Sequence, residues 1–592
     1  MSNARIARVL LTVAILNVIW IAGCRSKVAS SSAAAGRKGL TPCGAPQMPA
    51  EALCGTYEVF ENRAARTGHK IPLHIVVLPA TGPHPLPDPF TYFAGGPGAS
   101  SITEGVGVAQ WLGPLRQERD LFLVDFRGTG QSGGLFCSEI KDAEDVQGFL
   151  DDFLATDSVH ACRDRLMKEA DLSWYTTDAA IDDVEEVRTA LGYGQLNLIG
   201  NSHGTRAVLT YLQRHPQSIR TATLDGVLPP EARSLLNLAS ASQEALDGLI
   251  AECEGDPACK GAFPNLRQEI DAVLHTAATE PPVVTVLNPA ARRPLSLRLS
   301  LPAVAQTLRY MLYSPAEAAL VPLQVHLAAQ GDWKALARSA LTHGHELSQT
   351  AEGFFLSVTC AEDVALIGDD EIEAAVANTF LGDFRIRRQR AACEGWPIRD
   401  PARDVPARVA SDVPALLISG ERDPVTPASY GERAAQPLKN ARRVVIADGS
   451  HDLVGMRGED CEPAVIAAFI KSGTTEGLDV SCIATLRRPD FELPAVTVAK
   501  ADLQLLPGSF AAKEMPVAVR VALEGDRLRL YVTQGPPLPP AQLIPTSSLR
   551  FRCEADGWAP GLALTFQVSG GKATQLVLVQ PGKPELILRR TD

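Results

Sequence analysis

The chain has 592 residues, more than one hydrophobic core usually organises, so we expect several domains. Hydrophobic residues make up 45% of it and charged residues 21%, which is the composition of an ordinary globular protein. The formal net charge is -12 and no basic stripe stands out in the sequence, so a nucleic-acid partner is not expected.

The N-terminus has the pattern of an export signal. Arg5 and Arg8 precede an apolar run over residues 9–22. A charged stretch followed by a short apolar one is typical of a signal peptide. A transmembrane anchor is the alternative, but the run is short for a span of about 20 residues. We therefore expect a signal peptide over residues 1–23.

A lipid anchor is expected directly after this signal. The segment Ile21-Ala22-Gly23-Cys24 resembles the lipobox of bacterial lipoproteins, with Ile21 where Leu is commoner. The resemblance implies that Cys24 becomes the lipidated N-terminus and that the protein is exported and anchored to a bacterial membrane. It would face the periplasm or the cell exterior. The Ser/Ala/Gly-rich stretch over residues 24–42 predicts a flexible tether.

Cysteine usage points to an oxidising compartment. The chain has twelve cysteines, and neither a CxxC pair nor a His at ligand spacing accompanies them, so no metal site is expected. Apart from Cys24 and an unmatched Cys553, they can be arranged in five pairs, although spacing alone leaves the connectivity open. These pairs are Cys43 with Cys54, Cys137 with Cys162, Cys253 with Cys259, Cys360 with Cys393, and Cys461 with Cys482.

Two parts of the chain, residues 43–228 and 410–488, alternate short apolar runs with helical stretches. The alternation predicts parallel strands covered by helices. A helix is predicted over residues 178–191 from its apolar spacing, and another near 464–470. The predicted strands are residues 73–78, 90–93, 121–125, 196–199, 221–224, 415–419 and 443–446.

The segment 229–409 interrupts this alternation. Its pattern is largely helical, with Ala-rich stretches around residues 316–341. An independent domain in tandem is the alternative. However, the sheet pattern closes only if both flanks belong together, so we predict a helical lid inserted into the sheet domain.

The last part of the chain, residues 489–592, has a different texture. Strand-like runs at 517–523, 527–532, 562–568 and 574–579 are separated by Gly-rich turns. They predict a small antiparallel β domain without catalytic residues.

The strongest chemical signal is Gly200-Asn201-Ser202-His203-Gly204, a G-x-S-x-G motif between an apolar strand and a helix. On such a turn, side chains at the two glycines would collide with the neighbouring strand and helix. The turn presents the serine hydroxyl at the sheet edge, in front of a helix N-terminus. We predict that Ser202 is a nucleophile; an ordinary Gly-rich turn is the alternative.

A serine nucleophile needs a base and an acid that orients the base. In the α/β-hydrolase fold the order along the chain is Ser, acid, His. Asp423 follows the strand at 415–419, and His451 follows the strand at 443–446. Glu421 competes with Asp423, which is preferred because the Pro-Val-Thr-Pro after it resembles the acid loop of this fold.

An oxyanion hole is predicted from the Gly-rich loop after an early strand. The loop reads Gly95-Gly96-Pro97-Gly98, and the backbone N–H groups of Gly96 and His203 are the candidate donors. A tight turn without this role is the alternative. The nucleophile, the acid, the base and the glycine loop together predict an α/β-hydrolase sheet domain. With the segments described above, the predicted fold is this domain with an inserted, mainly helical lid and a small C-terminal antiparallel β domain.

These motifs resemble those of proline iminopeptidases and, more closely, of the secreted tripeptidyl aminopeptidases of bacteria, over about residues 43–482. Ala94 departs from the iminopeptidase pattern, which has His before the glycines. The C-terminal domain resembles β-barrel-like domains appended to some serine hydrolases. The segments that carry the resemblance are the glycine loop, Asp125-Phe126-Arg127-Gly128-Thr129-Gly130-Gln131-Ser132, the G-x-S-x-G motif, residues 253–263, Cys360-Ala361-Glu362-Asp363 and residues 461–482.

The resemblance implies a serine exopeptidase that acts on peptides with a free N-terminus. An anion must then hold the α-ammonium group, and Glu362 and Asp363 are candidates, with a helix cap or a salt bridge as the equally good structural explanation. Asp125 and Arg127 are expected to brace loops behind the site. No organic cofactor is expected. A carboxylesterase on the same fold and an inactive binding protein are the alternatives.

Overall fold

The structure is a computed structural model that describes residues 39–592 except 46–47, 141–145, 153, 289–292, 347–349, 400–407, 514, 536–537, 555–561 and 581–584. The predicted signal peptide, Cys24 and most of the predicted tether lie outside these residues. Among the helices that the structure describes, none combines the length and the apolar character that a bilayer span requires.

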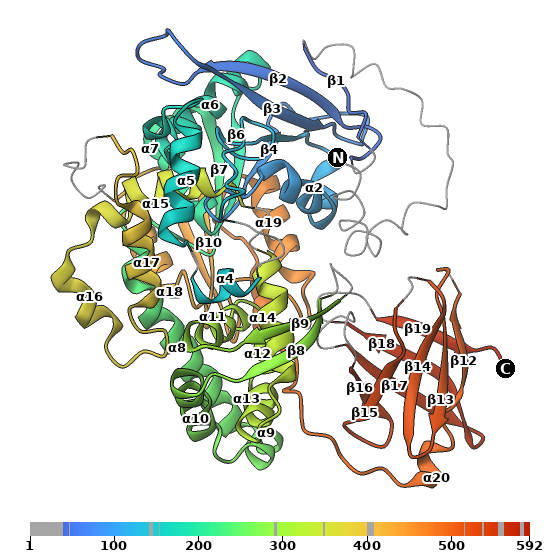
Figure 1. Cartoon of the computed structure of the whole chain (residues 1–592). Helices are drawn as coiled ribbons and strands as arrows, with labels where there is room; N and C mark the ends of the chain where they lie inside the picture. Colours follow the sequence, from blue (N-terminus) through green and yellow to red (C-terminus); the bar gives the residue numbers. More distant parts are fainter. Residues whose placement is uncertain are drawn as a thin grey trace.

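A mixed sheet runs through the upper part of the molecule as drawn in Figure 1. The strands run in the order β1-β2-β3-β5-β4-β6-β7-β10-β11, antiparallel up to the β3–β5 pair and parallel from β5 onward. This order confirms the predicted α/β-hydrolase fold. The strands are β1 (Thr41–Pro42), β2 (Leu53–Phe60), β3 (Lys70–Leu78), β4 (Phe90–Phe93), β5 (Leu121–Val124), β6 (Leu196–Asn201), β7 (Ile219–Asp225), β10 (Ala415–Gly420) and β11 (Ala441–Ile446).

One predicted boundary differs from the structure. The end of the stretch predicted as a tether, Thr41–Pro42, is strand β1 and pairs with β2. The disulfide between Cys43 and Cys54 fixes this pair, because it joins the residue after β1 to the second residue of β2. Composition alone could not reveal this constraint.

Helices cover both faces of the sheet because side chains alternate along each strand. On β10, Leu417 packs into the core with α5 (Thr156–Leu166), α6 (Thr177–Ala190) and α7 (His203–Arg214). Leu416 and Ile418 pack into the opposite core with α2 (Ser101–Trp111) and α19 (Cys461–Ser472). The remaining described helices of the sheet domain are α3 (Gly113–Arg116), α4 (Val146–Asp151) and α18 (Ala428–Ala435).

The segment between β7 and β10 is an insertion between two neighbouring strands, because Ala222 of β7 pairs in parallel with Ala415 of β10. The insertion has its own apolar core and, besides its helices, a β-hairpin that the sequence did not reveal. Its elements are α8 (Ser234–Gly255), α9 (Pro257–Ala262), α10 (Leu266–Thr279), β8 (Val283–Asn288), β9 (Arg293–Arg298), α11 (Leu301–Met311), α12 (Pro315–Ala318), α13 (Val321–Ala329), α14 (Lys334–Glu346), α15 (Glu352–Glu362), α16 (Asp369–Val376) and α17 (Phe384–Cys393).

The C-terminal domain is a closed antiparallel barrel that lies against the insertion (Figure 1). Phe510, Phe551 and Phe566 fill its interior, so it is a packed core. An ion pair between Arg338 and Glu554 (3.6 Å) connects α14 to the barrel. The strands are β12 (Gly508–Ala512), β13 (Ala518–Glu524), β14 (Arg527–Gln534), β15 (Ala541–Pro545), β16 (Arg550–Glu554), β17 (Ala563–Ser569), β18 (Lys572–Val579) and β19 (Leu586–Arg590), and α20 (Lys500–Leu503) precedes them.

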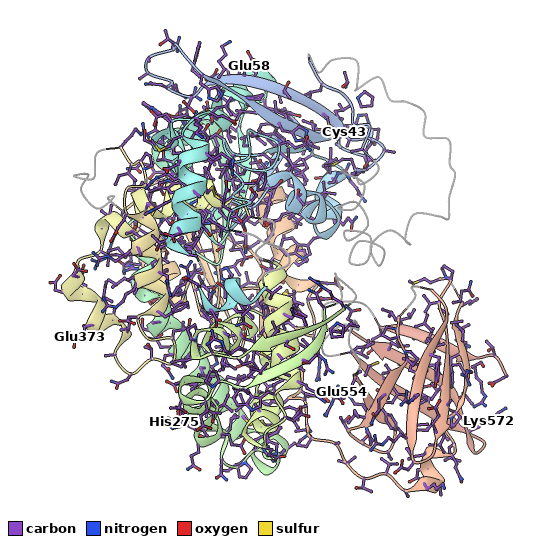
Figure 2. All side chains as sticks on the ribbon, viewed as in Figure 1. Cys43, Glu58, His275, Glu373, Glu554 and Lys572 are labelled. Atoms are coloured by element: carbon purple, nitrogen blue, oxygen red, sulfur yellow. A yellow bond between two sulfur atoms is a disulfide. The ribbon has the colours of Figure 1, made fainter. Side chains whose placement is uncertain are left out.

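All five expected cysteine pairs are disulfides, and Cys553 is a free thiol. Figure 2 draws the side chains and labels Cys43, which belongs to the first of these bridges. The bridge from Cys360 to Cys393 joins α15 to α17 within the insertion. The bridge from Cys461 to Cys482 ties the start of α19 to the chain that follows it. These two disulfides therefore hold the ends of α15, α17 and α19 in place.

A buried ion pair braces the loop after β5, as expected for Arg127. The Arg127 guanidinium donates to both carboxylate oxygens of Asp183 on α6, at 2.7 and 2.8 Å, and both side chains are buried. It also donates to the carbonyls of Glu61 and Trp174. Asp125 accepts from Ser100 Oγ (2.7 Å) and thereby ties the same loop to the start of α2. Arg127 and Asp125 thus hold the loops behind the sheet edge.

Replacing Asp183 with Asn should lower the free energy of unfolding by about 3–5 kcal/mol, because it leaves the buried Arg127 charge uncompensated. The measurement is urea denaturation followed by circular dichroism. Asp412→Asn is the matched control, since its ion pair with Lys439 is exposed on both sides and should contribute little. Equal unfolding curves for the two variants would contradict the assigned role of Asp183.

Candidate active site

Ser202 occupies a strained turn between β6 and α7. Its φ is 55° and its ψ is -122°, a conformation that non-glycine residues rarely adopt. A side chain at Gly200 would come within 2.3 Å of the Gly204 carbonyl oxygen, and one at Gly204 within 2.0 Å of the Phe93 carbonyl oxygen. The Ser202 N–H donates to the Asp225 carbonyl (2.9 Å), which fixes the turn to β7. The two glycines are therefore required by close packing.

Asp423 and His451 are brought together from the ends of β10 and β11. His451 Nδ1 lies 2.8 Å from Asp423 Oδ2. The carboxylate also accepts from the N–H groups of Val425 and Thr426, at 2.8 Å each, and from the Thr426 hydroxyl at 2.6 Å. With these partners the Asp423 side chain has one orientation, and it fixes the imidazole through Nδ1.

The electrostatics of this pair favour a charged imidazolium. Burial acts to raise the pKa of Asp423, but His451, Thr426 and the backbone donors outweigh it, so the pKa lies below its ordinary value. Burial acts to lower the pKa of His451, but the Asp423 carboxylate outweighs it and the net shift is upward. A histidine in this setting can accept a proton and later donate it to another group.

Glu421, the competing acid, lies elsewhere. Its side chain is exposed, and its carboxylate accepts from the Asp448 N–H at 3.3 Å. Of the two loop carboxylates, only Asp423 contacts His451 in the structure.

His451 approaches the nucleophile turn through Gly226, where an added Cβ would lie 3.2 Å from His451 Cε1. Gly226 follows Asp225, whose carbonyl accepts the Ser202 N–H. Ser202, His451 and Asp423 therefore follow the carboxyl ends of β6, β11 and β10, which lie at the same edge of the parallel part of the sheet. The Ser202 hydroxyl itself makes no hydrogen bond with any residue that the structure describes.

The glycine loop lies against the nucleophile. A Cβ on Gly95 would come within 3.1 Å of Ser202 Cβ, and Gly96 has a φ of 110° that favours glycine. The Gly95 N–H acts to lower the pKa of Glu104, although burial outweighs it and the net shift is upward. The Gly96 N–H has no partner among the described residues, and His203 is the first residue of α7, whose N–H lacks an intrahelical acceptor. Both candidate donors are thus available in the described structure.

The insertion contacts the active site at the histidine loop and at the glycine loop. Tyr313, just after α11, sets its ring edge-to-face against His451 with centroids 5.1 Å apart. Its carbonyl accepts the Asp452 N–H at 3.0 Å, and Arg309 donates to its hydroxyl at 2.6 Å. On the other side, the Ala351 N–H donates to the Gly98 carbonyl at 3.0 Å. The insertion therefore contacts the histidine loop and the glycine loop at the same time.

Glu362 and Asp363 are engaged by residues of the sheet domain. Asp363 is buried and lies 3.1 Å from the guanidinium of Arg206, which is also buried. Glu362 accepts from the N–H and the hydroxyl of Thr177, both at 2.8 Å, and lies 3.8 Å from Arg206. Burial raises the pKa of Glu362 to about 7. These contacts match the salt-bridge explanation that the sequence left open.

The same network reaches the residue after the nucleophile. Thr177 Oγ1 lies 3.1 Å from His203 Nε2. Burial, and then Arg206, lower the pKa of His203 to about 3, so its ring is neutral. Sequence reasoning missed Thr177, Arg206, Thr426 and Tyr313. Thr426 and Arg206 could have been suspected, because they lie three and four residues after Asp423 and Ser202 in the sequence. Thr177 and Tyr313 could not, because they come from segments far from the motifs.

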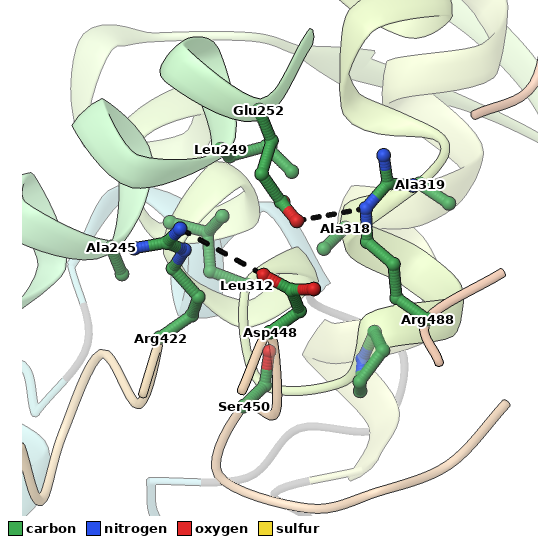
Figure 3. A pocket seen from close by; sticks show the side chains of 11 residues that line it. Ala245, Leu249, Glu252, Leu312, Ala318, Ala319, Arg422, Asp448, Ser450 and Arg488 are labelled. Carbon is green, nitrogen blue, oxygen red and sulfur yellow. Dashed lines mark hydrogen bonds and ion pairs between the residues drawn. The ribbon is translucent and has the colours of Figure 1, made fainter. Parts of the chain in front are cut away.

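A small pocket lies behind the histidine loop, between α8 and α12 (Figure 3). Its charged side chains form two ion pairs, Glu252 with Arg488 at 2.9 Å and Arg422 with Asp448 at 3.8 Å. Burial, and then a hydrogen bond with Asp448, raise the pKa of Glu252 to about 7. Within the described residues, no cluster of three or more His, Cys, Asp or Glu could hold a metal ion.

Comparisons with known proteins agree with this geometry. Residues 89–259 match a family described as alpha/beta hydrolase fold, and residues 378–482 match one described as TAP-like protein. The first match contains Ser202, and the second contains Asp423 and His451. The resemblance expected from the sequence is thereby confirmed.

The chain is also similar to individual proteins. It is 27% identical to serine protease Hip1 of Mycobacterium tuberculosis, with 75% of this chain and 90% of the relative covered. It is 24% identical to tripeptidyl aminopeptidase of Streptomyces lividans, with 77% and 88% covered. A solved alpha/beta hydrolase fold protein from Chitinophaga pinensis is 14% identical, with 70% and 97% covered and a TM-score of 0.30.

Replacing Asp423 with Asn should lower kcat for an aryl ester by about 10⁴-fold, because the neutral amide no longer holds the base in its productive tautomer. Glu421→Gln is the matched control and should retain the activity, because the Glu421 carboxylate accepts from the Asp448 N–H and does not contact His451. Steady-state kinetics on the two variants check this. A larger loss in Glu421→Gln would assign the acid to Glu421.

Proposed function

We propose that this protein, a serine hydrolase of the α/β-hydrolase fold, is an exopeptidase that releases residues or short peptides from free N-termini. The observation that carries the proposal is the His451–Asp423 hydrogen bond beside the strained turn of Ser202. Support for a peptide substrate comes from the similarity to a serine protease and a tripeptidyl aminopeptidase over three quarters of the chain.

The proposed mechanism proceeds through an acyl-enzyme. Ser202 Oγ attacks the scissile carbonyl carbon while His451 Nε2 takes the hydroxyl proton. Asp423 holds Nδ1 and stabilises the imidazolium, whose pKa it already raises. The N–H groups of Gly96 and His203 stabilise the oxyanion, a contribution of about 3–4 kcal/mol per donor in comparable sites. His451 then protonates the leaving amine, and a water activated by His451 releases the acyl product.

The insertion supports action on chain ends. Tyr313 contacts His451, and Ala351 bonds to the glycine loop, so the insertion borders the site on two sides. An internal segment of a folded protein would have to pass between these contacts, whereas a peptide end needs only one entrance. A carboxylesterase remains the alternative, because the same triad and oxyanion donors serve esters.

We also propose that the protein is exported and lipid-anchored through Cys24. The five disulfides support an oxidising compartment, since such bridges rarely persist in the cytosol. Peptides reaching that compartment would then be the substrates.

Hydrolysis of one short peptide arylamide, with its N-terminus free or acetylated, tests the function, together with a simple aryl ester. We expect good cleavage of the free-amine form, poor cleavage of the acetylated form, and no activity in Ser202→Ala. Labelling of Ser202 by a fluorophosphonate separates an enzyme from an inactive binding protein. Cleavage of the ester alone would favour the esterase.

Replacing Cys24 with Ser should move the protein from the membrane fraction to the soluble fraction of the producing bacterium, because the lipid acceptor is lost. Fractionation with an antibody against the barrel measures the shift. Cys553→Ser, which changes the free cysteine of the described residues, is the matched control and should leave the distribution unchanged. Membrane retention of Cys24→Ser would overturn the lipid anchor.

A further inference from the structure

Three carboxyl groups near the active site, those of Asp225, Asp452 and Glu462, come from the end of β7, the loop after His451 and the first turn of α19. None of the three forms an ion pair with any residue that the structure describes. His451 is the basic group whose charge acts on both Asp225 and Asp452. No ion pair within the described residues therefore compensates these three carboxyl groups when they are ionised.

Asp225 lies directly next to the nucleophile. It is the last residue of β7, stands opposite Asn201 in the sheet and accepts the Asn201 side-chain amide at 3.0 Å. Ala222 and Leu224 of the same strand pack on the α6 and α7 face. Because side chains alternate along a strand, Asp225 points to the other face, where α19 packs.

Asp452 reaches the same region from the histidine loop. It follows His451, and its N–H is held by the Tyr313 carbonyl of the insertion at 3.0 Å. One carboxylate oxygen accepts from the Val454 N–H at 2.8 Å. The side chain is exposed, although burial by the surrounding protein raises its pKa to about 7.

Glu462 is the least expected member. It lies in the first turn of α19, where a glutamate usually caps the helix or faces water. Here it is only 6% exposed, and its Oε1 is buried with no hydrogen-bond partner. Its neighbour Cys461 packs with Ile199 and Ile418 in the core on the α19 face. A buried carboxyl without a partner is costly unless something outside the chain compensates it.

The three groups act on one another. Burial raises the pKa of Glu462 well above its ordinary value, and the charges of Asp225 and Asp452 raise it further. Burial also raises the pKa of Asp225 to about 6. Glu362 and Asp363, by contrast, already face Arg206. A cation arriving from outside finds uncompensated carboxyl groups at the first cluster and occupied ones at the second.

We propose that Asp225, Asp452 and Glu462 form a subsite that binds an ammonium group of the substrate beside Ser202. The inference rests on the proposed peptidase function for its substrate, and it assigns the recognition of the cation to this side of the site. An ammonium group can come from the free N-terminus of a peptide or from a lysine side chain. Either one supplies the hydrogen-bond donors that the buried Glu462 oxygen lacks.

The test compares wild type with Glu462→Gln and Asp452→Asn on matched substrates. One peptide arylamide is prepared with a free N-terminus, with an acetylated N-terminus, and acetylated with one lysine; an aryl ester serves as the neutral reference. The ratio of kcat/KM for the ammonium-bearing peptide to that for the ester should fall about 10-fold or more in both variants. The ratio cancels any general loss of activity.

The control is Glu61→Gln, because Glu61 is equally buried (7%) but is hydrogen-bonded to Tyr175 away from the site. Its ratio should equal that of wild type. Fluorophosphonate labelling of Ser202 shows whether the active site of each variant is folded. If Glu462→Gln does not fold, Asp452→Asn still tests the subsite, because Asp452 is exposed. Which peptide responds identifies the N-terminus or the lysine as the bound cation. Unchanged ratios in both variants overturn the subsite.

Failure of the proposed function gives a different result. If wild type cleaves no peptide arylamide, the peptidase proposal falls, and inhibition of ester hydrolysis then tests the subsite alone. A tripeptide amide with a free N-terminus should inhibit about 10-fold more strongly than its acetylated form, and Glu462→Gln should remove the difference. Equal inhibition of wild type by both amides overturns the subsite.

Discussion

The parallel pairing of β7 with β10 holds the active site together. β7 fixes the nucleophile turn through the bond from the Ser202 N–H to the Asp225 carbonyl. β10 ends in the loop of Asp423, and β11 beside it leads to His451. Because the long insertion leaves the sheet at β7 and returns at β10, it cannot separate these groups. The strand pairing that carries the catalytic residues is therefore continuous despite the insertion.

The insertion is nevertheless coupled to the site by specific contacts. Tyr313 touches His451, and Ala351 binds the glycine loop. Deeper in the protein, Arg206 of α7 pairs with Asp363 at the end of α15. The cross-link from Cys360 to Cys393 stiffens that end of the insertion. A shift of the insertion would thus displace groups on both sides of Ser202. We therefore expect the insertion to influence substrate specificity.

Charge compensation divides the acidic residues around the site into two groups. Asp183, Asp363 and Glu252 each have an arginine within hydrogen-bond distance, and their role is to hold elements together. Among the described residues, neither Asp225 nor Glu462 has an arginine this close; Asp225 accepts from Asn201, and the Glu462 Oε1 atom is buried without a partner. The sequence cannot separate these two groups, because the arginine that pairs with an acidic residue is usually distant from it in the chain.

The sequence by itself determined the α/β-hydrolase order, the nucleophile motif, the disulfide candidates and the acid and base candidates, because each depends on local pattern and chain order. The tertiary structure decided which carboxylate meets His451, that Glu362 and Asp363 are engaged by Arg206, and that Glu462 is buried without a partner. It also revealed β2, the hairpin β8–β9 and the barrel strands β12, β15, β16 and β19, whose short or mixed patterns show no clear period. Burial and pairing in these cases are set by residues distant in sequence, and only folding brings those residues together.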